Sequence, residues 1–146
     1  MNLDDPHDLN RFLIAQQGVY DRALAELQSG QKRTHWMWYI FPQIDGLGYS
    51  PTAKRYSIKS IEEAQQYLNH PVLGKRLLEC TEAVVVIKGG SLSEIFGYPD
   101  DMKFKSSMTL FEKIAGSSSV FSSALDRYCN GERDTTTLRL LEKSHH

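Results

Sequence analysis

The chain has 146 residues, enough for one hydrophobic core and short for two. Its 40% hydrophobic and 24% charged residues are ordinary for a soluble globular protein, and a net charge of −1 gives no electrostatic reason to expect a nucleic-acid partner. No apolar stretch approaches the ~20 residues that span a membrane, and the acidic start lacks the features of a secretory signal. We therefore expect one cytoplasmic domain over residues 1–143, with 144–146 a disordered tail or cloning remnant.

The first predicted element is a helix from Leu9 to Leu27, because apolar residues recur there at spacings of three and four. Asp8 is its expected N-cap, and Gly30 is expected to end it. Gln16 falls inside the apolar stripe, where a buried amide needs partners for both its oxygen and its nitrogen. We interpret Gln16 as a structural amide that ties two helices together, with ligand contact as the alternative.

The most distinctive segment runs from Thr34 to Gln43 and holds both tryptophans, a histidine and two further aromatic residues. Burying large aromatic side chains removes much apolar surface from water, at roughly 25 cal/mol per Å², so this aromatic run is predicted to lie in the core. The polar edges of His35, Trp36 and Trp38 are also candidate walls of a pocket. The two interpretations are compatible, because a pocket wall can belong to the core.

Further helices are predicted along the rest of the chain from capping residues and apolar periodicity. The segment from Val84 to Ile87 alone would suit a buried strand, but helix is preferred because no partner strand is evident elsewhere. Together the elements predict an all-α fold, a compact single domain of about seven helices in an irregular array. The expected starts of these later helices are Ser50, Ser60, Pro71, Ser91, Tyr98, Val120 and Asp134.

The titratable residues carry no catalytic or metal-binding signature. Cys80 and Cys129 have no Cys-x-x-Cys spacing and no local histidine partner, so they are expected to be reduced structural thiols. His7, His35 and His70 are scattered, and we predict neither a metal nor another cofactor. Because no nucleophile or carboxylate accompanies His35, nucleophilic catalysis is unsupported, and the sequence leaves enzymatic turnover undecided.

The strongest candidate site combines cations and hydroxyl groups near two predicted helix starts. Lys103, Ser106 and Ser107 belong to one start, and Arg55 and Tyr56 to the other. Helix N-termini present unpaired N–H groups and positive potential, which such side chains complete into a site for phosphate or carboxylate. The alternative is that Ser106 bonds its own helix, an aspartate occupies the positive helix end, and Lys103 is solvated.

Five segments are distinctive in combination: Arg11 to Gln16, His35 to Gln43, Gly46 to Gly48, His70 to Gly74 and Lys103 to Phe111. In these segments the chain resembles an uncharacterised bacterial family of unknown function, some members of which carry an automatic calpastatin label. The resemblance covers nearly the whole chain and implies a single-domain, all-helical fold, with no established reaction or catalytic residues. Calpastatin is a disordered, repetitive inhibitor, whereas this chain has the aromatics and periodicity of a compact domain.

Two functional hypotheses follow. In the first, a pocket binds a small anionic, phosphate- or nucleotide-like ligand that stacks on Trp36 or Trp38, while Gln43 contacts its polar groups. In the second, the aromatic run is purely structural, and exposed helical faces bind a protein partner or form a homodimer. The candidate ligand-binding residues are His35, Trp36, Trp38, Gln43, Arg55, Tyr56, Lys103 and Ser106.

The two hypotheses predict different surfaces. A concave pocket joining His35, Arg55 and Lys103 favours the ligand, and a contiguous apolar patch favours the partner. Replacing Arg55 or Lys103 by glutamine is expected to weaken anion binding without unfolding the protein. Lys32, interpreted as solvated, is the control position.

Overall fold

The computed structural model describes residues 5–143 and contains ten helices there. The predicted all-α class is confirmed, since these residues form no strand, but the predicted number of about seven helices is wrong. The predicted tail at 144–146 and the first four residues lie outside the described part. The helices are α1 (Asn10–Gln16), α2 (Tyr20–Gln28), α3 (Met37–Ile40), α4 (Pro51–Arg55), α5 (Ile61–Asn69), α6 (Leu73–Val85), α7 (Leu92–Phe96), α8 (Asp100–Ala115), α9 (Val120–Tyr128) and α10 (Thr135–Lys143).

The helix count differs because two short features escape periodicity. The predicted first helix is two helices, α1 and α2, separated where Gln17 becomes extended and Gly18 takes a φ of 72°. Glycine adopts a positive φ without steric cost, so the chain turns there while its apolar residues keep their helical spacing. The other addition is α3, a four-residue helix inside the aromatic run.

Capping side chains define most of the predicted helix starts. Ser50 and Ser60 each accept a hydrogen bond from the N–H group three residues further on, and Ser91 belongs to a complete capping box. At α1 the prediction is wrong, because it is the carboxylate of Asp5 that accepts the N–H groups of Leu9 and Asn10, at 2.7 and 2.9 Å. Asp8 has a φ of 50° and therefore lacks the extended geometry of an N-cap.

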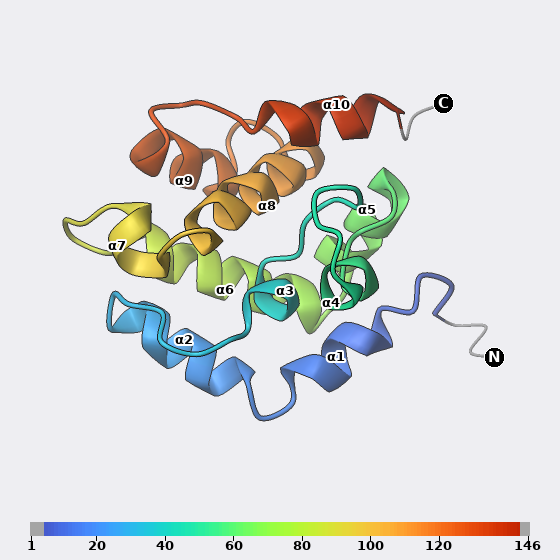
Figure 1. Cartoon of the computed structure of the whole chain (residues 1–146), viewed down its shortest axis with the longest axis horizontal. Helices are drawn as coiled ribbons and strands as arrows, with labels where there is room; N and C mark the ends of the chain where they lie inside the picture. Colours follow the sequence, from blue (N-terminus) through green and yellow to red (C-terminus); the bar gives the residue numbers. More distant parts are fainter. Residues whose placement is uncertain (1–4, 144–146) are drawn as a thin grey trace.

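Helix α6 lies at the centre of the molecule (Figure 1). It contacts α2 on one side and α9 on the other, and it also packs against α5, while α8 joins α5, α7, α9 and α10. The crossing of α5 and α6 is unusually close at Gly74, where a Cβ atom would lie 1.9 Å from the backbone oxygen of Leu68. Only glycine fits at this crossing.

The aromatic run enters the core through its central residues. Trp36 and Phe41 have no exposed surface, and Met37 and Ile40 are at most 2% exposed. The Phe41 ring meets the Phe104 ring of α8 edge-on, with ring centroids 5.0 Å apart. The predicted core position of this run is therefore confirmed.

Gln16 is the structural amide that the sequence predicts. Its nitrogen donates to the backbone oxygen of Tyr39 at 2.7 Å and to the hydroxyl of Tyr67 at 3.3 Å. Its oxygen accepts from Arg76 at 3.1 Å. One buried side chain thus connects α1 to α5, α6 and the aromatic run, with both ends of the amide satisfied.

Candidate functional site

Trp36 is fixed by Glu26, a residue that the sequence analysis did not single out. The indole N–H of Trp36 donates to the Glu26 carboxylate at 2.9 Å. The same carboxylate accepts the N–H groups of Arg33 and Thr34 and the hydroxyl of Thr34. Burial raises the pKa of Glu26, but these four hydrogen bonds outweigh it and lower the pKa to about 2. Since Trp36 has no exposed surface, it belongs to the core and offers no ring face for stacking.

Trp38 and Lys103 do come together, as the candidate site requires. The ammonium of Lys103 lies 4.3 Å from the centre of the Trp38 ring, a cation–π contact. Asp100 lies 3.5 Å from the same ammonium and 2.9 Å from that of Lys32. Only 7% of the Lys32 side chain is exposed, so its interpretation as a solvated control is wrong. Lys32 thus joins the loop after α2 to α8 through Asp100, whereas Lys103 pairs with Asp100 within α8 itself.

The Arg55 side chain is exposed, and its guanidinium lies 5.6 Å from the centre of the Tyr56 ring. Tyr56 in turn packs edge-on against Tyr39 of α3, with ring centroids 4.8 Å apart. These contacts place Arg55 and Tyr56 beside the aromatic run. Neither residue makes an ion pair or ring contact with the group formed by Lys32, Trp38, Asp100 and Lys103.

The remaining candidates have separate surroundings. His35 is exposed, and half-buried Gln43 uses its backbone oxygen to accept the N–H of Ile58 at 2.8 Å. The Ser106 hydroxyl bonds the Met102 carbonyl of its own helix and also Asp134, which caps α10. Within residues 5–143, no hydrogen bond, ion pair or ring contact joins Arg55 to Lys103 or Ser106, and Ser106 makes the bond to its own helix that the alternative interpretation describes.

Arg11, which the sequence analysis left without a role of its own, organises the surface beside Arg55. Its guanidinium donates to four backbone carbonyls, those of His7, Asp8, Arg55 and Ser57, and to the carboxylate of Glu63 at 2.7 Å. The Arg11 and Glu63 side chains are only 7% and 2% exposed. This buried ion pair therefore connects the N-terminal turn, the end of α4, and α5.

Arg11 and Glu63 both line a hollow of about 590 Å³ between the N-terminal turn and α4. It contains four cationic side chains and two carboxylates, and Glu63 is already paired with Arg11. Lys59 is occupied as well, by the Lys54 carbonyl and the Ser57 hydroxyl. The hollow is lined by Pro6, His7, Asp8, Arg11, Pro51, Lys54, Arg55, Lys59 and Glu63, so Arg55 is the one predicted site residue in it.

The cysteines and histidines form no metal site within the residues described. Cys80 and Cys129 are free thiols, and burial raises the pKa of Cys80 to about 12. Within residues 5–143 no three histidine, cysteine, aspartate or glutamate side chains group as metal ligands would. None of the helices described is long and apolar enough to span a membrane.

The comparisons with known proteins agree with this all-helical fold. A family model described as "Protein of unknown function (DUF1810)" matches residues 6–141. The chain belongs to the DUF1810 family. The family description mentions neither an activity nor calpastatin. The chain is similar to the conserved hypothetical protein Rv1873 from Mycobacterium tuberculosis, whose crystal structure superposes with a TM-score of 0.91. The two sequences are 51% identical, and the match covers 94% of this chain and 99% of that chain. No curated protein matches the sequence.

Proposed function

We propose that this DUF1810 protein binds a small anion of the phosphate or nucleotide class in the hollow between its N-terminal turn and α4. The observation that carries the proposal is that Lys54 and Arg55 line this hollow without an ion-pair partner among the residues described, whereas Arg11 is paired with Glu63 and Lys59 with Asp45. Lys54 and Arg55 are exposed, consecutive residues of α4, and both line the hollow. Two neighbouring cations over a concave surface attract a multivalent anion better than either does alone.

The proposed site is narrower than the one predicted from the sequence. Arg55 is retained as a ligand contact, and its guanidinium packs over the ring of Tyr56. Lys103 already has a carboxylate partner in Asp100, and Trp36 is inaccessible. The proposal concerns binding and assigns no chemical step.

Pyrophosphate is the probe that tests this site, because it presents several anionic oxygens and no base. We expect its titration to shift the backbone amide resonances of α4 and the N-terminal turn. Arg55→Gln or Lys54→Gln should weaken binding about ten- to a hundredfold, the effect of losing one charge-assisted hydrogen bond of about 1.5–3 kcal/mol. Both variants should unfold at the same urea concentration as the wild type, because the side chains are exposed.

The matched control is Arg22→Gln, which removes an exposed arginine from α2, outside this hollow. It should leave pyrophosphate binding unchanged. A titration that shows no binding at millimolar pyrophosphate, or equal losses for Arg55→Gln and Arg22→Gln, would show that the hollow is not an anion site. Adding AMP as a second probe then separates recognition of the phosphate from recognition of a nucleotide.

A further inference from the structure

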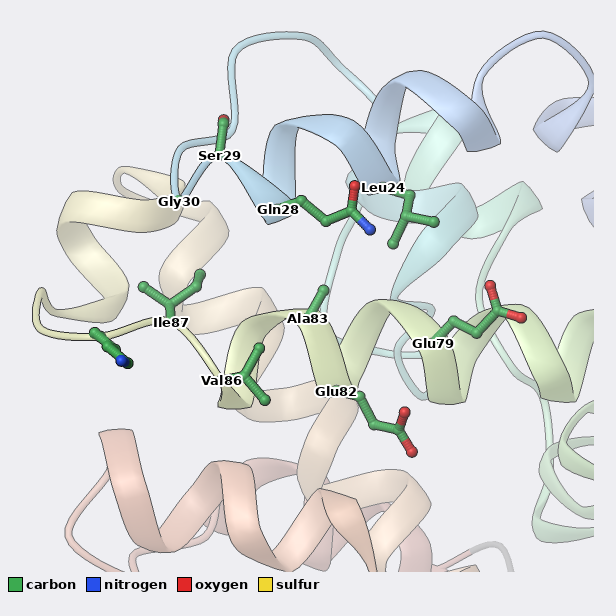
Figure 2. Close-up of a pocket in the computed structure, with 10 residues that line it drawn as sticks. Leu24, Gln28, Ser29, Gly30, Glu79, Glu82, Ala83, Val86 and Ile87 are labelled. Atoms are coloured by element: carbon green, nitrogen blue, oxygen red, sulfur yellow. The ribbon is translucent and has the colours of Figure 1, made fainter.

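A second hollow, of about 720 Å³, lies between α2 and α6 (Figure 2). Leu24 of α2 and Ala83 of α6 point into it from opposite sides, and Val86 and Ile87 continue its apolar surface towards the end of α6. Val86 is 72% exposed. Apolar side chains grouped in an exposed groove are the kind of surface that a protein partner covers.

The two helices that form this groove run in the same direction. Tyr20, at the start of α2, donates to Glu79 of α6 at 2.6 Å, and Gly30, just beyond α2, lies against Ile87, just beyond α6. Their C-termini therefore lie at the same end of the groove. Helix C-termini carry partial negative charge, although at the end of α6 the Arg127 guanidinium donates to the Ile87 carbonyl and offsets part of it.

Carboxylates extend this negative potential along the groove. Glu79 and Glu82 line it from α6, and an adjoining hollow that shares Ser29, Gly30, Ile87 and Lys88 brings in Glu94. Across the two linings there are three glutamates and one lysine. The surface is thus apolar between the two helices and has more carboxylates than cations around it, although Glu79 accepts from Tyr20 and Glu94 from the Ser91 N–H.

We propose that this groove docks an amphipathic segment of a partner protein that carries lysine or arginine beside its apolar residues. The apolar floor would bury the segment's hydrophobic side chains, and the glutamates and helix ends would attract its cations. From Glu79 to Val85, where α6 ends, the groove follows the helix for about 9 Å at 1.5 Å per residue, somewhat less than two helical turns. The site is separate from the anion hollow, with which it shares no lining residue.

The test uses a synthetic helical peptide of leucine and lysine and a matched peptide with glutamate in place of lysine. Each is titrated into the full-length protein, and backbone amide shifts are recorded. We expect the lysine peptide to shift resonances of α2 and the second half of α6, and the glutamate peptide to leave them unchanged. Glu82→Lys, at an exposed position, should weaken the lysine peptide about tenfold.

Glu142→Lys supplies the control, because it reverses an exposed charge on α10, outside the groove. It should change affinity little, and far-UV circular dichroism should show that both variants are folded. Three results would overturn the proposal: no binding of the lysine peptide, equal losses in the two variants, or shifts that map outside α2 and α6. Concentration-dependent dimerisation through the same residues would also overturn it, since a second copy would then be the occupant.

Discussion

Glu26 is the position where the fold should be most sensitive to one conservative change. Its carboxylate gathers two backbone N–H groups, a threonine hydroxyl and the Trp36 indole, and so fixes the loop that leads into the aromatic run. Glu26→Gln keeps the size of the side chain but removes the charge and replaces one acceptor oxygen with a donor. At least one of the four donors then loses its partner.

The magnitude follows from the pKa of this carboxyl. The difference between its ordinary value of 4.5 and about 2 corresponds to roughly 3.4 kcal/mol, at 1.36 kcal/mol for each pH unit. Part of the carboxylate reaches solvent, and glutamine keeps one acceptor, so the expected loss is smaller. We expect Glu26→Gln to lower the free energy of unfolding by about 1.5–3 kcal/mol.

Urea unfolding, followed by tryptophan fluorescence and circular dichroism, measures this loss. Because folding lowers the pKa of Glu26, its contribution is fully present above pH 4.5 and disappears as the pH falls towards 2. The stability difference between wild type and Glu26→Gln should therefore shrink over that interval. A loss no larger than that of Glu62→Gln, at a surface position with a 75% exposed side chain, or a difference independent of pH, would refute this account.

Two further changes test the packing. Gly74→Ala should cost about 1–3 kcal/mol or more, because the new Cβ would meet the backbone oxygen of Leu68, and a thermal melt that matches wild type would mean that α5 and α6 separate freely. Arg11→Met should lower the free energy of unfolding by about 3–5 kcal/mol, because it leaves Glu63 buried without its cation. In urea unfolding, the double variant Arg11→Met/Glu63→Gln should recover part of that loss. No recovery would mean that the carbonyl contacts of Arg11 dominate.

The fold could be predicted wherever the determining interactions are local. Ser60 and Ser91 correctly predict the starts of α5 and α7, because a capping hydrogen bond spans only three residues. The choice of helix over strand is correct up to Val85, because the apolar stripe of α6 extends over several turns and outweighs the β-branched residues, although Val86 and Ile87 lie beyond the end of the helix. The break at Gly18 could not be predicted in this way, because it changes the direction of the chain without interrupting the apolar spacing.

The site was harder to predict because its contacts connect distant parts of the chain. Trp36 could have faced a pocket, and what decides otherwise is Glu26, on the preceding helix. Lys32 belongs to a basic dipeptide that is typical of a solvated surface, yet its ammonium pairs with Asp100 on α8. Residue type predicts that such groups need partners, but only the packing of α2 and α8 shows which partners they find.

Arg55 and Lys103, which the sequence predicted to act together, have different surroundings in the structure. Arg11 contacts Arg55 only through its backbone carbonyl, so the Arg55 guanidinium stays exposed at the hollow. Lys103 lies between Trp38 and Asp100, so removing its charge breaks a partly buried ion pair and a ring contact. The two glutamine variants should therefore behave oppositely. Arg55→Gln should weaken pyrophosphate binding and spare stability, whereas Lys103→Gln should lower stability and spare binding. If both weaken binding equally, the anion site extends to the aromatic run after all.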